Sequence, residues 1–409
     1  MISLYLRDSE SLDDDDQYLE VVTKVCRSWR TAALANRRLW SRILIDLQGY
    51  PYRGDYEMRK SRLQRYLQRS VAVPLSVEIT LKADNWPPDD RVSKKRIKTL
   101  IALTSQELSR WESLSIDFQD EETVHKFIRR AWNDEPIDSL EPFLSSPMPG
   151  LRRLSLCGVY TSFEDLLPHV PLLNAFEAKG GYSTELTIPW SSLTSFRYSP
   201  TELGIDSDLL EQLSQCIQLK DLYIEGICDA YELEPAFDCT LPHVVSFHLD
   251  SGPSREPINT ILANVRFPSL QNLTLVVPYA FWERSEESSV PPHSVGFAGT
   301  CKTLTLLRAD ESHDDWDRPS SRHTNLRSAI FDMFNAMPDL EELRMSEEIS
   351  EVFLKVIKEE EDLVPKLSRV FILDTGGVEA PLTLDELASR WQRGENRKTK
   401  EDHSRYVLG

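Results

Sequence analysis

The sequence lacks a hydrophobic run long enough to cross a membrane. No stretch of about 18 consecutive apolar residues occurs among its 409 residues. Residues 1–20 contain an aspartate run, 13–16, at the place where a signal peptide has its apolar segment. These two absences predict a protein of the cytoplasm or nucleus that makes no membrane contact.

An excess of positive charge is also missing. The chain has 47 Lys and Arg against 66 Asp and Glu, which gives a formal net charge of −19. Binding to nucleic acid or to an anionic membrane needs a basic face. The charge balance therefore predicts no nucleic-acid partner and favours other proteins as partners.

Signatures of catalysis and of metal binding are scarce. The 15 glycines form no phosphate-binding loop, and no Gly-x-Ser-x-Gly elbow is present. The six cysteines form no Cys-x-x-Cys pair, so we expect buried free thiols. Residues 313–317 are interpreted as a solvated acidic loop, and His243 and His248 as facing opposite sides of one strand. We therefore expect no enzyme, no catalytic residues, no metal and no cofactor.

One short pattern recurs along the chain. Apolar residues stand at i, i+3 and i+5, often after a proline, as in Pro149 followed by Leu151, Leu154 and Leu156. The copies begin at Trp111, Leu151, Leu173, Leu193, Leu219, Val244, Leu270, Cys301, Leu340 and Leu367. The i+3 and i+5 residues would share one face of a short strand, with the first apolar residue at the preceding turn.

Six successive copies in the middle, beginning at 151, 173, 193, 219, 244 and 270, are 20 to 26 residues apart, which is the period of leucine-rich repeats. Residues 206–215 and 328–337 have apolar residues at helical spacing between the expected strands. The prediction is an α/β fold: an irregular leucine-rich-repeat solenoid of parallel strands with outer helices. Irregularity is expected because regular repeats place Asn or Cys after the strand, whereas this chain has no such ladder. Residues 283–299 and 309–325 are predicted loops.

The N-terminal part predicts a small helical hairpin. Val22, Val25, Cys26, Trp29 and Ala33 are spaced as one face of a helix. Asn36 can end that helix, and Leu39, Trp40 and Ile43 would form a second short apolar face. Such a hairpin is too small to be stable alone, so it must pack on the repeats, on a partner, or on both.

The segment 25–30, with Leu39, Trp40 and Ile43, resembles the second half of an F-box. Residues 66–70 and 74–77 resemble the stretch that follows the F-box in a family with irregular leucine-rich repeats. The resemblance implies a substrate receptor of a Skp–cullin–F-box ubiquitin ligase, in which other subunits perform the transfer chemistry. It implies that the Skp adaptor is contacted near these positions: Val22, Val25, Trp29, Leu39 and Trp40. For each of the two tryptophans, a role in the core of the hairpin is favoured over direct contact.

The sequence departs from the F-box pattern at its opening. An F-box usually begins with a Leu-Pro turn and a short helix ending in Ile-Phe, and residues 1–18 contain neither. Either the first half is absent or the start of the chain is truncated, so adaptor binding stays open.

These observations divide the chain into five segments. We expect an acidic tail over 1–18, the partial F-box-like segment over 19–48, and a connecting helix with the first strand over 49–110. The repeat array would cover 111–380, and a capping helix with a polar tail would cover 381–409. In the last segment, Thr383 and Glu386 form a capping-box pair.

Three functional hypotheses remain at this point. The favoured one is a ligase substrate receptor that binds an unknown protein substrate on its exposed strand face. The second is an adaptor-free interaction scaffold, and the third, a remote one, is an enzyme with an unrecognised site. The residues expected on the strand face are Arg153, Ser155, Asp221, Tyr223, Ser246, His248, Asn272, Thr274, Glu342 and Arg344.

Overall fold

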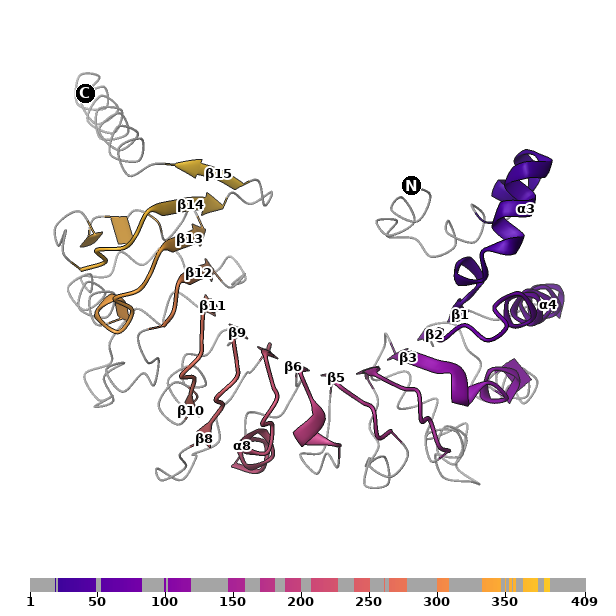
Figure 1. The fold of residues 1–409 in the computed structure, drawn as a ribbon, viewed down its shortest axis with the longest axis horizontal. Coiled ribbons are helices and arrows are strands. Elements are labelled where there is room, and N and C mark those ends of the chain that lie inside the picture. The colour runs from indigo at the N-terminus through magenta and orange to yellow at the C-terminus, as the bar shows by residue number, and fades with distance from the viewer. Residues whose placement is uncertain are drawn as a thin grey trace, which may run out of the picture. The chain divides into compact units, whose positions relative to one another are not determined.

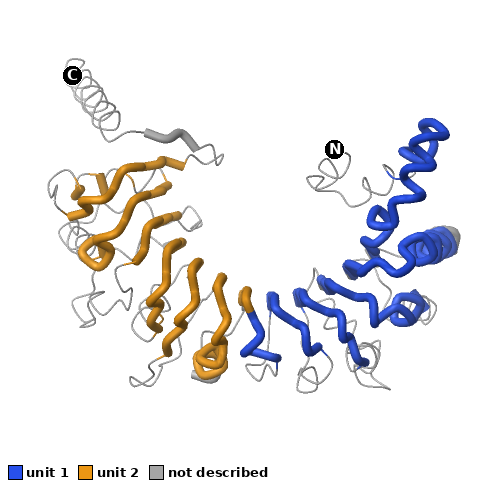
Figure 2. Tube along the Cα trace, viewed as in Figure 1, with its two compact units in different colours: residues 1–193 blue, residues 194–409 orange. Residues whose placement is uncertain are grey.

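The structure is a computed structural model of the whole chain. It describes residues 19, 21–48, 53–82, 99–100, 102–118, 146–158, 170–180, 188–199, 207–226, 239–250, 261, 265–277, 300–308, 333–346, 350, 353–354, 356–357, 363–373 and 379–382. The chain forms two compact units, residues 1–193 and 194–409 (Figure 2). The expected acidic tail, the loops 283–299 and 309–325, the acidic cluster 313–317 and the C-terminal capping helix lie outside the described residues.

Parallel strands form the first unit. They are β1 (Arg42–Gln48), β2 (Leu75–Lys82), β3 (Trp111–Phe118), β4 (Arg153–Cys157) and β5 (Ala175–Lys179), each paired with the next in chain order (Figure 1). Its helical elements are α3 (Arg27–Ala35), η1 (Arg37–Trp40), α4 (Arg53–Arg69), η2 (Leu108–Arg110) and η4 (Trp190–Ser192). The first unit is therefore α/β, with the strand order of a repeat stack.

The second unit continues the same type of pairing within itself. In order, β6 (Ser195–Ser199), β7 (Asp221–Ile224), β9 (Ser246–Asp250), β11 (Asn272–Val277), β12 (Thr303–Arg308), β13 (Glu342–Ser346) and β14 (Arg369–Leu373) pair in parallel. An antiparallel strand, β15 (Glu379–Leu382), pairs with β14. Helix α8 (Ser207–Ser214) lies between β6 and β7 in the chain, and β8 (Cys239–Thr240) pairs with β10 (Val265–Arg266). The expected α/β fold with parallel strands is confirmed for each unit.

The recurring apolar residues form the core of both units. In the copy that contains β4, Leu151, Leu154 and Leu156 are at most 2% exposed. The equivalent residues of the next strands pair in register, as Leu154 does with Phe176. Because full burial of one leucine side chain is worth about 1.5–3 kcal/mol, each strand with its neighbours gains most of its stability from these positions.

The proline of the pattern has a more specific place than the sequence indicated. The amide of Leu151 donates to the carbonyl of Met148 at 3.1 Å, which closes a four-residue turn around Pro149 and Gly150. The same bond joins Leu270 to Phe267 around Pro268, and Leu340 to Met337 around Pro338. Proline fixes φ for the second position of such a turn. The residue before it is fully buried, as Met148 is, and this repeated position was missed.

Glycine ends two neighbouring strands of the first unit. Gly158 and Gly180 follow β4 and β5 with φ angles of 67° and 102°. The amide of Gly158 donates to the carbonyl of Lys179 at 2.7 Å. A Cβ on Gly180 would lie 3.0 Å from the Gly158 nitrogen, so both the left-handed backbone and the close contact require glycine.

The helix predicted over 206–215 is confirmed as α8, whose Leu209, Leu210 and Leu213 are buried. Of the stretch 328–337, the structure describes 333–337, and residues 333–335 are helical.

The N-terminal hairpin was predicted less well. Residues 21–25 are helical, but Cys26 has extended angles (φ −156°, ψ 170°) and separates them from α3. The second helix is only the 3-10 turn η1, and Ile43 belongs to strand β1. The expectation of a second helical face through Ile43 was wrong, because Ile43 alternates with Ile45 as the buried face of a strand. Paired strands therefore begin at Arg42, well before the predicted start of the array at 111.

Candidate partner-binding surfaces

The five residues expected near an adaptor do not share one environment. Val25 and Trp29 are exposed, at 57% and 45%. Val22 and Leu39 are half-buried. Trp40 is only 2% exposed, so it is a core residue and its assignment to an adaptor contact was wrong.

Trp40 holds the N-terminal helix against the first unit. Its indole Nε1 donates to the Ala33 carbonyl of α3 at 2.8 Å. Its ring meets Tyr66 of α4 edge to face at 5.2 Å, and the Arg69 guanidinium lies 4.2 Å from the ring centre. Trp40 therefore joins α3, η1 and α4, which is the core role left open for it in the sequence.

This segment exposes apolar side chains beside basic ones, which are Lys24, Arg27 and Arg30. Val21, Val25, Trp29 and Leu34 are each at least 37% exposed, whereas Ala33 is the one residue of α3 that is buried. Buried apolar contact is what normally stabilises so short a helix. The segment from 21 to 34, referred to below as the α3 surface, thus presents apolar side chains without burying them.

Five described cysteines are free, and they are not all buried as expected. Burial raises the pKa of Cys216 and Cys301 to about 12. Cys26 is exposed, and its Sγ lies 3.1 Å from Ser28 Oγ. The Ser28 hydroxyl and then the Trp29 amide lower the pKa of the Cys26 thiol.

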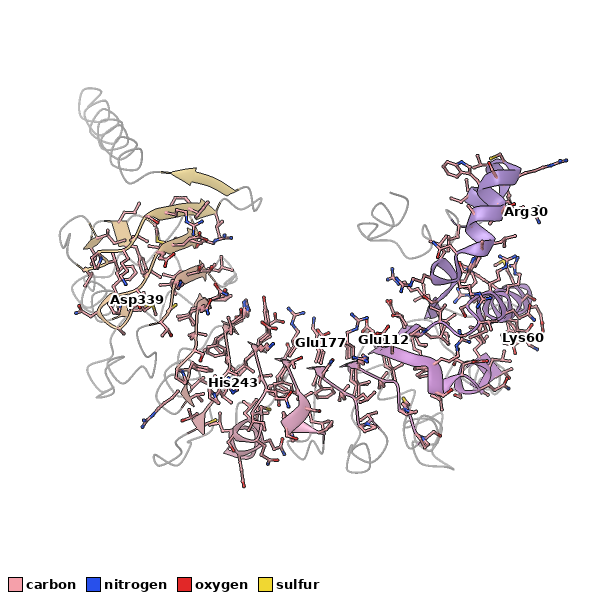
Figure 3. The ribbon with its side chains drawn as sticks, viewed as in Figure 1. Arg30, Lys60, Glu112, Glu177, His243 and Asp339 are labelled. Atoms are coloured by element: carbon pink, nitrogen blue, oxygen red, sulfur yellow. The ribbon has the colours of Figure 1, made fainter. Side chains whose placement is uncertain are left out.

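The predicted strand-face residues of the first unit lie on the solvent side of β4. Arg153 is exposed, and Ser155 is half-buried with its hydroxyl 3.0 Å from a Glu177 carboxylate oxygen of β5. Glu177, labelled in Figure 3, alternates along β5 with the buried Phe176 and Ala178 and so lies on the other face of the strand. The solvent face of β4 and β5 is therefore polar, with a hydrogen bond between the two strands.

In the second unit, Tyr223 and His248 lie side by side on neighbouring strands. Their rings stack at 4.0 Å with an interplanar angle of 7°. Arg197 of β6 covers the other face of Tyr223, with its guanidinium carbon 4.2 Å from the ring centre. Such cation–π contacts are worth about 0.5–2 kcal/mol. These three residues, called the β6–β9 stack, form an ordered row across three strands.

Glu225 completes this cluster. One of its carboxylate oxygens lies 3.7 Å from an Arg197 guanidinium nitrogen and 4.0 Å from His248 Nε2. Burial, and then the positive charge of Arg197, lower the pKa of His248 from 6.5 to about 4. His248 is therefore neutral at physiological pH, and Glu225 pairs with Arg197 rather than with a charged imidazole.

Four further predicted residues lie near the stack. Asp221 and Asn272 are exposed, and Ser246 and Thr274 are half-buried. The Asn272 side-chain amide donates to Ser246 Oγ at 3.2 Å. These positions face solvent as expected from the two-residue period of the strand.

Glu342 was wrongly placed among the solvent-facing residues. Its side chain is 6% exposed, and its carboxylate accepts from Arg344 Nε at 2.7 Å and from Arg369 at 3.0 Å. Arg344 in turn lies over the Phe371 ring at 5.1 Å. Two guanidinium groups thus cover Glu342, which the strand period alone could not predict. We call Glu342, Arg344 and Arg369 the β13–β14 arginine pair with its central carboxylate.

Sequence reasoning missed Arg197, Glu225, Arg369 and Phe371, although they were accessible to it. Arg197 is the residue between the apolar Phe196 and Tyr198, as Tyr223 is between Leu222 and Ile224, and the register aligns the two. Listing every residue at this alternate position would have named the members of the stack, although not their contacts.

The sequence predicted that His243 and His248 lie on one strand, and this was wrong. His243 lies in the turn before β9 and is exposed (Figure 3), whereas His248 lies within β9. Among the described residues no group of three or more His, Cys, Asp or Glu side chains is placed to hold a metal ion.

The described part of the chain has no helix of the length and apolar character that a membrane crossing requires.

Comparison with known proteins gave little. No protein-family model matches the chain, and no curated protein matches it. A crystal structure of a protein from Bacteroides fragilis is similar at 13% sequence identity, over 83% of this chain and 69% of that chain, with a TM-score of 0.28. A similarity at that TM-score supports no conclusion about fold or function.

Proposed function

We propose that this protein is a non-catalytic receptor that binds other proteins through two surfaces. The α3 surface would contact the Skp adaptor of a cullin-type ubiquitin ligase, and the solvent face of the parallel strands would hold a protein substrate. The N-terminal motif resembles part of an F-box, and this resemblance supplies the identity of the adaptor. In this role the protein would act in the cytoplasm or nucleus.

The observation that carries the proposal is the exposure of Trp29 on α3 and of Val25 just before it. Trp40 donates a hydrogen bond to Ala33 in the last turn of α3, so Trp29 belongs to a helix that is held on the rest of the first unit. Exposed tryptophan on a fixed element is typical of the few residues that dominate the free energy of protein association.

The strand face supports the substrate-binding half of the proposal. Its described residues form a stack of Arg197, Tyr223 and His248, and a second cluster around Arg344. Tyrosine and arginine are enriched at binding hot spots. Rings and guanidinium groups that already contact one another lose less conformational entropy when a partner binds.

The test is binding of the intact chain to a purified Skp adaptor, measured by biolayer interferometry. Replacing Trp29 by Ala should weaken binding by about thirtyfold or more, since a central tryptophan contributes about 2 kcal/mol or more. Met58→Ala is the matched control, because Met58 is exposed to 59% on α4 and lies outside the proposed surface. Circular dichroism of each variant should be unchanged. Equal binding by the Trp29→Ala variant, or no binding by the intact chain, would contradict the adaptor half.

The second candidate is an adaptor-free interaction scaffold. It is favoured by the small size of the exposed contact, since Trp40 is buried and Val22 and Leu39 are half-buried. In that case the intact chain would not bind the adaptor, while its strand face would still bind a protein.

A further inference from the structure

Helix α3 and the residues on either side of it carry positive charge in a chain that is acidic overall. Residues 21–38 contain no Asp or Glu, whereas the whole chain has a formal net charge of −19. Arg27, Arg30 and Arg38 are exposed, and no ion pair between described residues involves them. Lys24 has interactions of its own and does not count toward this excess. The three arginines therefore form an uncompensated positive charge.

The charges of α3 also oppose the dipole of the helix. Arg27 is the first residue of α3 and Arg30 lies about one turn later, whereas the first turn has no acidic residue and the last turn has no basic one. Positive groups near the N-terminal end of a helix disfavour it, and so do like charges three residues apart. Carboxylates brought by a partner would reverse both effects. Negative charge from outside is therefore what this helix lacks.

The exposed apolar side chains of α3 lie on both sides of an arginine. Successive residues of an α-helix are about 100° apart, so Trp29 and Leu34 are separated by about 140° around the axis, with Arg30 between them. Arg27 lies on the other side of Leu34. Ala33 is buried in the same sector as Arg30 but one turn further along, so a partner reaches this sector at the N-terminal half of α3, where Figure 3 labels Arg30. Trp29 and Leu34 are 45% and 37% exposed.

We propose that the α3 surface binds an acidic protein segment in which carboxylate side chains stand between apolar ones. The carboxylates would pair with Arg27 and Arg30, and the apolar side chains would cover Trp29 and Leu34. The inference rests on the proposed function in taking the α3 surface as a partner contact. It adds the chemistry of the partner, and it applies equally to the Skp adaptor and to any other protein that contacts α3.

Charge and the arrangement of the side chains select this occupant over three others. A nucleic acid or an anionic membrane would be repelled by a chain whose net charge is −19. A helix that lies on a membrane needs one continuous apolar face, whereas Arg30 divides the apolar side chains of α3. A purely apolar protein surface would take the guanidinium groups of Arg27 and Arg30 out of water without pairing them, which opposes binding. An acidic and partly apolar protein segment meets none of these objections.

A random library of displayed 12-residue peptides serves as the probe. Selection on the immobilised intact chain is compared with selection on the Trp29→Ala variant, so that enrichment reports binding at α3. The enriched peptides should carry at least two Asp or Glu between apolar residues. The best peptide, synthesised with a fluorescent label, should bind the intact chain with an affinity that falls as salt is added, because exposed charges are screened.

Charge variants then measure the contribution of the two arginines. Arg27→Gln with Arg30→Gln keeps good helix formers and should weaken binding of the labelled peptide by about three- to tenfold, as expected for two exposed charge pairs. Arg27→Glu with Arg30→Glu should weaken it further, because like charges then meet. Arg59→Gln with Lys60→Gln removes two positive charges from α4, outside the α3 surface, and is the matched control that should leave binding unchanged. Circular dichroism of the variants should match that of the intact chain.

Several results would overturn the inference. These are enriched peptides without acidic residues, no peptide enriched over the Trp29→Ala variant, and an affinity that Arg27→Gln with Arg30→Gln leaves unchanged. Binding to phosphatidylserine vesicles that this double variant abolishes would assign the α3 surface to a membrane instead. A more than tenfold gain in peptide affinity when the four aspartates 13–16 are replaced by Asn would assign it to the chain's own acidic segment.

The adaptor measurement is made on the same variants and separates the two proposals. Adaptor binding that falls with Arg27→Gln and Arg30→Gln supports both. Adaptor binding that needs Trp29 but does not respond to the loss of the two arginines leaves the proposed function standing and overturns this inference. Acidic peptides selected on a chain that does not bind the adaptor refute the ligase role and support the inference for another protein partner.

Discussion

Replacing Trp40 tests how strongly α3 is held on the rest of the first unit. The side chain is 2% exposed and contacts Tyr66 and Arg69 of α4, while its indole donates to Ala33 of α3. Truncation of a buried tryptophan to alanine costs about 3–5 kcal/mol. Because units of a repeat stack contact only their neighbours, this loss should be confined to α3, β1 and α4.

The expected result of Trp40→Ala is local opening of this region. A loss of about 4 kcal/mol corresponds to roughly a thousandfold fall in protection, since 1.4 kcal/mol is tenfold. Hydrogen–deuterium exchange with peptide-level mass spectrometry would detect it in residues 27–48 and 53–69. Amides of β11 and β12 in the second unit serve as the internal reference and should keep their protection.

Two further variants make the measurement specific. Trp40→Phe keeps a ring against Tyr66 but removes the donor to Ala33, so it should lose less than Trp40→Ala. Trp29→Ala removes an exposed ring and should change protection by less than about 0.5 kcal/mol. The assignment of Trp40 to the core would be refuted if Trp40→Ala lowered the free energy of local opening by less than 1 kcal/mol. It would also be refuted if Trp29→Ala lowered this free energy as much as Trp40→Ala.

Three other predictions concern separate parts of the chain. Gly180→Ala should destabilise the first unit by about 1–3 kcal/mol in thermal unfolding, because φ of 102° is strained for alanine and the new Cβ would lie 3.0 Å from the Gly158 nitrogen; an unchanged midpoint would contradict this. Because burial and Arg197 lower the pKa of His248 to about 4, the unfolded chain binds a proton between about pH 4 and 6.5 that the folded chain excludes. Urea unfolding should therefore show stability lost over this range as pH falls, by at most about 3 kcal/mol, and His248→Asn should flatten that slope. Cys26, exposed and with a lowered pKa, should react with iodoacetamide at pH 8 much faster than Cys216, whose pKa of about 12 leaves only about one thiol in 10⁴ ionised; equal labelling in mass spectrometry would argue against it.

The inward positions of the strands were predictable because a physical constraint fixes them. Leu154, Phe196 and Leu273 are at most 2% exposed, and each can only be apolar if neighbouring strands are to pack. The same constraint fails to fix where the pairing begins. Strand β1 was missed because Ile43 is three residues from Trp40, a spacing that fits a helix as well as the end of one element and the start of another.

The outward positions were predictable in direction but not in environment. Tyr223 and His248 face solvent as expected, yet their stacking with Arg197 follows from the register of β6, β7 and β9, which the sequence alone does not reveal. Glu342 illustrates the opposite outcome. Its position points to solvent, but Arg344 and Arg369 cover it, because long basic side chains from the same and the neighbouring strand reach across the face.

The α3 surface and the strand face differ in how well they are ordered before a partner binds. Strand-face side chains are held by strands whose other side is buried, so a partner meets a surface that is already ordered. Helix α3 has nine residues and buries only Ala33, and an isolated helix of that length is marginal in water. The contact of Trp40 with Ala33 holds its C-terminal end, while Trp29 near its start is exposed. Contact at Trp29 would therefore stabilise the helix as well as bind it, and a variant that loosens Trp40 should weaken adaptor binding without touching the contact itself.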